Sequence, residues 1–165
     1  MMNNSFLNHN TCYFISHKGE DGQNFFLCET DYKFYLRLLK KYKLKFDIQI
    51  FAFCLLSDAI YLILQPPNVK NLSIFITCVT QSYRLYLNAR YSGKANVWQK
   101  KYRSFAIVTD DALFECVKYV ESVPVRAKIV VNPAEYPWSS HSLRVSGRDN
   151  YILDKQSQNR GAFHA

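Results

Sequence analysis

Glycine is scarce in this chain, and features that mark several common protein classes are missing as well. Five glycines in 165 residues are too few for the glycine-rich loops that cradle nucleotide phosphates. No apolar run reaches the roughly 18 residues of a membrane-spanning helix, and the start of the chain lacks the basic and apolar segments of a secretory signal. The five cysteines form no CxxC pair, which argues against a zinc knuckle. We therefore expect a cytoplasmic protein with reduced cysteines and no membrane partner.

Acidic residues are absent from the middle of the chain. No Asp or Glu occurs from Ala59 to Thr109, whereas the whole chain has 13 acidic residues against 21 Lys and Arg. A solvated helix face normally mixes charges of both signs, and cations interleaved with aromatic rings are typical of a groove that follows phosphates and stacks unpaired bases. The DNA-binding candidates in this stretch are Arg84, Arg90, Lys94, Trp98, Lys100, Lys101, Tyr102 and Arg103. The alternative is a basic surface that binds no ligand.

Hydrophobic periodicity predicts the order β, α, β-hairpin, α, β, α. Thr30 and Thr109 are the expected N-caps of the first and last helices, and Pro124 is expected to end the last one. Ser57 and Asp58 suit a tight turn between the hairpin strands, and the second of these strands is apolar on both faces and should be central. Strands are expected over residues 11–16, 46–56, 59–65 and 102–108, and the middle helix over 69–90.

This order of elements fits an α+β fold with a ferredoxin-like antiparallel sheet. We expect the helices on one face of the sheet, with an additional C-terminal helix. A single domain should span residues 1–147, and the polar residues 148–165 are expected to form a flexible C-terminal tail.

Three motifs follow one another in the second part of the chain. Gly93–Ser104 reads GKANVWQKKYRS, Lys118–Ala127 reads KYVESVPVRA, and Tyr136–Ser140 reads YPWSS. These motifs resemble those of the IS200-type transposases. The first resembles the family's block of glycine, tryptophan and basic-aromatic residues. The second resembles its tyrosine helix followed by Asn-Pro-Val-Arg-Ala, and the third its Tyr-x-Trp-Ser-Ser motif. The resemblance is to the branch associated with repetitive extragenic palindromes (REPs), and it extends from Cys12 to Leu143.

The resemblance implies a DNA partner, single-stranded or folded into a hairpin, in a bacterial cytoplasm. Members of the family nick single-stranded DNA beside a hairpin through a 5′-phosphotyrosine. A divalent metal, Mg²⁺ or Mn²⁺, is held by a His-apolar-His triplet and polarises the scissile phosphate. Tyr119 matches the family's nucleophile. Arg126 matches the arginine of the Pro-Val-Arg-Ala segment, which would either contact phosphate or hold the end of the helix.

The sequence departs from the family where the metal site is expected. Ala59 and Tyr61 stand in place of the two metal-binding histidines, and Phe14 replaces a histidine common in the first strand. Alanine has no ligand atom, and a neutral tyrosine is a weak ligand for a hard cation. We therefore expect no metal or other cofactor, and a transposase-derived protein that binds DNA without cleaving it. Tyr119 should still project towards Tyr61.

Two other functions are compatible with the same residues. One is active, metal-dependent nicking and strand transfer through Tyr119, with a substitute metal site to which Asp58 or His17 would contribute. The other is a protein-interaction module that kept the fold and lost the nucleic-acid function. The acid-free stretch favours DNA binding over the interaction module, and the changes at residues 59 and 61 favour binding over cleavage. Monomers and dimers both occur in the family, so the oligomeric state is left open.

The cation-aromatic stretch predicts DNA binding that is electrostatic and prefers single strands. Affinity for a single-stranded oligonucleotide should fall at least about tenfold between about 50 and 200 mM salt, because several contacted phosphates release counterions. Replacing Lys100, Lys101 and Arg103 together by Ala should weaken binding to many sequences alike. Fluorescence anisotropy measures both effects, and a flat salt response would contradict the prediction.

Overall fold

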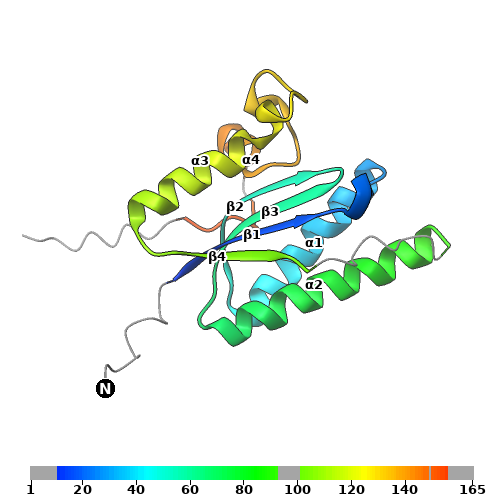
Figure 1. Cartoon of the computed structure of the whole chain (residues 1–165), viewed down its shortest axis with the longest axis horizontal. Coiled ribbons are helices and arrows are strands. Elements are labelled where there is room, and N and C mark those ends of the chain that lie inside the picture. Colours follow the sequence, from blue (N-terminus) through cyan, green and yellow to red (C-terminus); the bar gives the residue numbers. More distant parts are fainter. Residues whose placement is uncertain (1–10, 93–100, 149, 156–165) are drawn as a thin grey trace, which may run out of the picture.

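A four-stranded antiparallel sheet with the order β2-β3-β1-β4 forms the centre of the fold (Figure 1). The computed structural model describes residues 11–92, 101–148 and 150–155. Its strands are β1 (Cys12–Lys18), β2 (Gln49–Leu56), β3 (Ala59–Gln65) and β4 (Arg103–Ile107), and its helices are α1 (Glu29–Phe46), α2 (Val69–Arg90), α3 (Asp110–Arg126) and α4 (Ser140–Ser146). Short 3-10 turns span Glu20–Gly22 and Pro133–Glu135. The predicted α+β class, the antiparallel sheet and the central place of β3 are confirmed.

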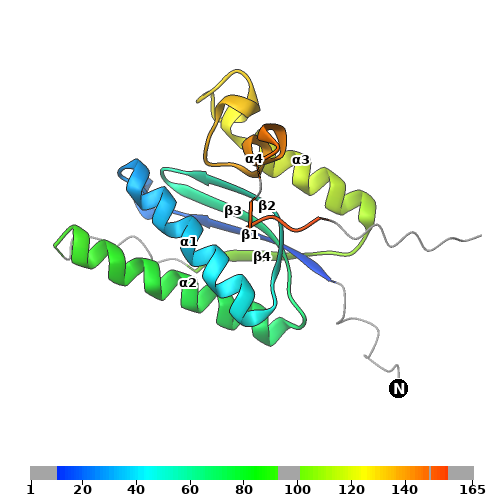
Figure 2. The ribbon, with the colours of Figure 1, turned by 180° about the vertical axis from the view of Figure 1, so that it is seen from behind.

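Helices cover both faces of the sheet (Figures 1 and 2). α1 and α2 pack together on the face formed in β3 by Ile60, Leu62 and Leu64. α3, the additional helix that follows the last strand, packs on the opposite face, which in β3 carries Ala59 and Tyr61. Both faces of β3 are buried from Ala59 to Leu64, which agrees with the unbroken apolar run of these residues. Within the described residues, no helix is long and apolar enough to cross a membrane.

The first helix begins around a buried carboxylate rather than at the predicted Thr30. Cys28 is the N-cap of α1, and its backbone N–H donates to Asp31 Oδ2 over 3.2 Å. Asp31 is buried and also accepts hydrogen bonds from the hydroxyls of Tyr86 and Tyr91, at 2.7 and 2.8 Å. Burial alone would raise the pKa of this carboxyl, but the donors outweigh it and hold the pKa below its usual value. The end of α2 therefore fixes the start of α1.

The last long helix continues past Pro124, where the sequence predicted its end. Pro124 has no N–H to donate, but it is buried, and this burial offsets the missing hydrogen bond. Helical hydrogen bonding resumes beyond it, where the N–H of Ala127 donates to the carbonyl of Val123 over 2.9 Å. As a result, Arg126 belongs to the same helix as Tyr119.

Two strand boundaries differ by two residues or more from those expected. β2 begins at Gln49 rather than at residue 46, because α1 continues through Phe46 and Asp47 ends it in the left-handed conformation, with φ of 55°. β1 continues through His17 and Lys18, beyond the expected strand end at residue 16, because both residues pair with β3. Lys18 is therefore part of the sheet.

The outer edge of β2 is covered by the C-terminal part of the chain. The N–H of Ile50 donates to Asp154 Oδ2 over 2.9 Å, and the N–H of Asp154 donates to the carbonyl of Ile50 over 2.8 Å. The buried ammonium of Lys43 pairs with the same carboxylate. Residues 150–155 thus pack on the sheet, within the stretch predicted to be a flexible tail, because an edge strand leaves N–H and C=O groups that need partners.

The Lys43–Asp154 pair should stabilise the fold measurably. Asp154→Asn would leave the Lys43 ammonium buried without its carboxylate, so we expect the free energy of unfolding in urea to fall by about 2 kcal/mol. Glu115→Gln is the matched control, because it removes the carboxylate of an exposed pair, 3.7 Å from Lys118. That variant should change stability by no more than about 0.5 kcal/mol. Equal losses of stability in Asp154→Asn and Glu115→Gln would contradict a stabilising role for the Lys43–Asp154 pair.

Candidate functional site

The pairing of β1 with β3 and β4 decides which side chains share a face of the sheet. Residues directly opposite each other in neighbouring strands point to the same face. Ser16 pairs with Tyr61 on one side and with Arg103 on the other, and Phe14 pairs with Phe105. Alternate residues of a strand also share a face. All five side chains therefore lie on the face on which α3 packs.

One half of this face is left uncovered, because α3 packs mainly over β2 and β3. On the half formed by β1 and β4, Phe105 is 59% exposed and Arg103 is also exposed. Lys18, opposite Ala59 in the register, is exposed as well. We call this half the open face, and its residues are Phe14, Ser16, Lys18, Arg103 and Phe105.

Tyr119 lies at the border of the open face. Its ring centroid is 6.1 Å from that of Phe14, and the Tyr61 centroid is 6.2 Å from the same ring. Tyr119 and Tyr61 therefore lie on the same side of the sheet, as the sequence predicted. Tyr119 is 41% exposed, whereas Tyr61 is only 8% exposed. A ligand on the open face can reach Tyr119, but Tyr61 is enclosed.

Arg126 lies beside Tyr119 on the surface of α3. Its guanidinium carbon is 5.0 Å from the centroid of the Tyr119 ring, within the range of a cation–π contact. Its Nε donates to Ser122 Oγ over 3.1 Å, and that hydroxyl donates to the carbonyl of Tyr119 over 2.8 Å. The side chain is exposed and held at the border of the open face. This position suits both roles left open by the sequence, phosphate contact and support of the helix end.

The residues at the family's metal position do not fit a divalent cation. Ala59 is buried, has no ligand atom and lies opposite the cationic Lys18. Burial, and to a lesser extent the phenol of Tyr119, raises the pKa of Tyr61. Tyr61 therefore keeps its proton at neutral pH and is a poor ligand for a hard cation.

The residues considered for a substitute metal site have other surroundings. His17 lies on the opposite face of the sheet, with its ring 5.4 Å from that of Phe25 and beside the buried Tyr35. Asp58 is in the turn between β2 and β3, where its carbonyl accepts a hydrogen bond from the N–H of Gly19 over 2.8 Å. Across the described parts of the chain, no three His, Cys, Asp or Glu side chains form a cluster that could hold a metal ion.

The other DNA-binding candidates fall on both sides of the sheet. Arg84 and Arg90 belong to α2, on the far side from the open face. Arg90 supports the start of α1, because its Nε is 3.5 Å from the Asp31 carboxylate. Tyr102 packs against the core under α1 and α2. Lys101 is exposed just before β4, while Lys94, Trp98 and Lys100 lie outside the described residues.

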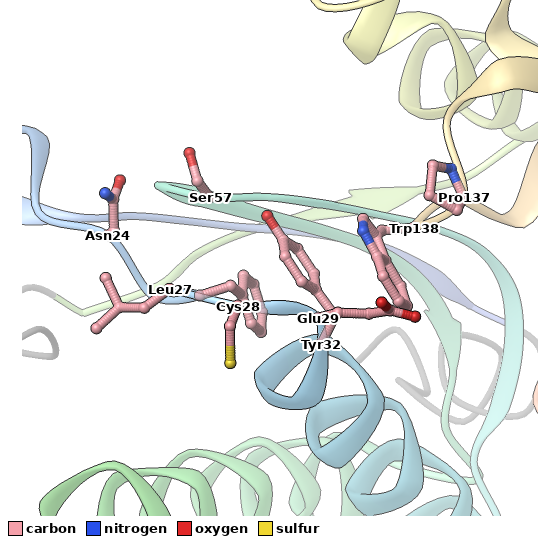
Figure 3. A pocket seen from close by; sticks show the side chains of 9 residues that line it. Asn24, Leu27, Cys28, Glu29, Tyr32, Ser57, Pro137 and Trp138 are labelled. Carbon is pink, nitrogen blue, oxygen red and sulfur yellow. The ribbon is translucent and has the colours of Figure 1, made fainter. Parts of the chain in front are cut away.

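A pocket of about 650 Å³ lies between the start of α1, the β2–β3 turn and Trp138 (Figure 3). Its aromatic residues are stacked on one another, since the Tyr32 ring lies 4.3 Å from Phe26 and 4.7 Å from Trp138 with nearly parallel planes. Both faces of the Tyr32 ring are thereby used within the protein. The pocket thus leaves no face of Tyr32 free for a base, unlike the open face, where Phe105 is exposed.

Sequence reasoning missed Phe105 and Lys18. Phe105 was placed within an expected strand without a role in the site, and Lys18 was placed beyond the end of the first strand. The available signal was the two-residue period of a strand, which puts Arg103 and Phe105 on one face and so joins a cation to an aromatic ring. Strand periodicity does not indicate whether a helix covers that face, and here the position of α3 decides it.

Comparison with known proteins identifies the family. Residues 23–123 match the family model of IS200-like transposases, so the chain belongs to that family. The solved structure of a REP-associated tyrosine transposase bound to a REP hairpin has a TM-score of 0.69 and 18% identity, over 91% of both chains. A protein assigned as a transposase in Deinococcus radiodurans R1 has a TM-score of 0.50 and 12% identity, over 74% of this chain and 97% of its own. These likenesses show a shared fold. The comparison with curated proteins gives no match.

The altered metal position predicts that Mn²⁺ does not bind there. Titration of the protein with Mn²⁺ near neutral pH, followed by electron paramagnetic resonance of the free ion, should show no saturable site, because Lys18 repels the ion and Tyr61 stays protonated. The double substitution Ala59→His with Tyr61→His supplies two imidazoles and is the comparison variant. Saturable binding to the parent protein that is lost in Tyr61→Phe would show that the position still holds metal.

Proposed function

We propose that this protein binds structured single-stranded DNA, such as a hairpin with an unpaired flank, and does not cleave it. The observation that carries the proposal is the open face, where exposed cations and an exposed aromatic ring adjoin the altered metal position. Family membership and the likeness in fold to a transposase bound to a REP hairpin support a DNA partner.

The charge around Tyr61 supports binding. Arg103 lies two strands away in the same row of the sheet, and Lys18 lies opposite the neighbouring position 59. Arg126 approaches from α3 through its contact with Tyr119. Three exposed cations on or at the border of the open face attract a phosphate backbone, whatever its base sequence.

The same surroundings argue against cleavage. A phenol is a weak nucleophile unless a neighbouring group activates it, and its attack on a phosphate anion needs charge stabilisation in the transition state. Ala59 and Tyr61 do not fit a metal that would supply it. Losing several kcal/mol of transition-state stabilisation lowers a rate by orders of magnitude. The exposure of Tyr119 is the observation that favours the alternative, active nicking through a phosphotyrosine.

Binding and cleavage can be separated at Tyr119. With Mg²⁺ or Mn²⁺ and a hairpin oligonucleotide, we expect no covalent protein–DNA band on a denaturing gel, because the phenol is not activated. Tyr119→Phe should bind the hairpin within about threefold of the parent, since it removes one hydroxyl and keeps the ring and its cation–π contact.

Each alternative predicts a different result in the same experiment. A covalent band in the parent that disappears in Tyr119→Phe would establish active nicking. A folded parent protein that binds neither hairpin nor single-stranded DNA at low salt would instead favour the protein-interaction module.

A further inference from the structure

Phe105 is an exposed aromatic ring on a strand at the edge of the sheet. It is 59% exposed, although it belongs to β4 and its partner on β1, Phe14, is also aromatic. Within the described residues no strand lies beyond β4. A large apolar ring on a sheet edge promotes association unless something covers it. We therefore expect the Phe105 ring to contact a partner outside the described parts of the chain.

The Phe14 ring lies next to the rings of Phe105 and Tyr119 but is stacked on neither. The centroids of Phe14 and Phe105 are 6.4 Å apart with an interplanar angle of 43°, and those of Phe14 and Tyr119 are 6.1 Å apart with an angle of 56°. Tilted rings do not cover each other's faces, so Phe14 does not stack over the exposed Phe105 ring. The Phe26–Tyr32–Trp138 stack is the internal contrast, because its rings cover one another.

Charge on the open face indicates the chemistry of the partner. Arg103 lies two residues before Phe105 on the same face, and Lys18 lies two residues after Ser16 on the neighbouring strand. β4 falls within the stretch of the sequence that has no Asp or Glu. Aromatic rings flanked by cations suit a ligand that combines flat rings with a chain of negative charge, which describes an unpaired nucleotide strand.

We propose that Phe105 and Phe14 form a base-stacking platform for unpaired nucleotides, with Arg103 and Lys18 contacting the adjacent phosphates. This inference rests on the proposed DNA binding and adds the part of the DNA that is recognised. Because every base has an aromatic face, the platform accepts unpaired bases with little sequence preference. Tyr119, in contact with Phe14, limits the platform on the side of α3.

The test uses a DNA hairpin with an unpaired flank that carries 2-aminopurine, whose fluorescence is quenched when it stacks. Phe105→Ala should weaken binding of this hairpin about tenfold or more and reduce the quenching, because one stacking contact is lost. Phe105→Tyr keeps an aromatic face and should bind within about threefold of the parent. Phe114→Ala is the matched control, because Phe114 is 57% exposed but belongs to the surface of α3, where Lys118 lies over its ring.

The flank and the charges give two further readouts. A fully paired hairpin without a flank should bind Phe105→Ala and the parent alike. Arg103→Gln should weaken binding of the flanked hairpin and also reduce its salt dependence, whereas Phe105→Ala should leave the salt dependence unchanged. Because Phe105 is largely exposed, Phe105→Ala should keep the thermal unfolding midpoint of the parent within a few degrees.

Three outcomes would overturn the platform. Parent-like binding by Phe105→Ala, with the parent binding the hairpin, would reject the platform and leave the proposed function intact. An equal loss with the unflanked hairpin would show that Phe105 does not act on unpaired bases. Failure of the parent to bind any hairpin, together with capture of a protein through this face that Phe105→Ala abolishes, would reject DNA as the partner altogether.

Discussion

The register of β1 between β3 and β4 is the constraint on which the candidate site depends. It places Tyr61, Ser16 and Arg103 in one row across the sheet, with Phe14 and Phe105 in the next. Because side chains alternate along a strand, a slip of β1 by one residue would turn Phe14 and Ser16 towards α1 and α2 and away from Tyr61. The register is held because β3 is buried on both faces and the tight turn at residues 57–58 fixes its pairing with β2.

The position of α3 decides how much of that face stays exposed. Glu121, buried on α3, accepts hydrogen bonds from Ser140 Oγ at 2.6 Å and Arg144 Nε at 2.7 Å, which joins α3 to α4. Ser140 Oγ in turn accepts a hydrogen bond from the N–H of Phe53 over 3.1 Å, at the edge strand β2. A buried carboxylate with these partners holds α3 over the β2 side. The β1 and β4 side remains uncovered, and Tyr119 lies at the boundary.

Sequence patterns predicted the parts of the fold that are decided locally. The bounds of β3 and α2 coincide with those expected, because a continuous apolar strand and a long apolar helical stripe are each visible within one window. The predicted start of α1 was wrong because the tyrosines that hold Asp31 come from the end of α2. The cation-aromatic stretch was found, yet it spans α2 and β4, which place its members on both sides of the sheet. Linear spacing cannot assign a face to residues in different elements, so the open face required the register.

Fixed cations and a divalent ion act differently on a tyrosine beside a phosphate. If DNA occupies the open face, Lys18, Arg103 and Arg126 attract the phosphates about equally before and during any attack, so they strengthen binding without lowering a barrier. A metal that contacts the scissile phosphate also stabilises charge that develops only in the transition state. A site that has fixed cations in place of a bound divalent metal therefore favours binding of the strand over its cleavage. The proposed base stacking on Phe105 would act in the same direction, because it would stabilise the bound state and contribute nothing to the reacting phosphate.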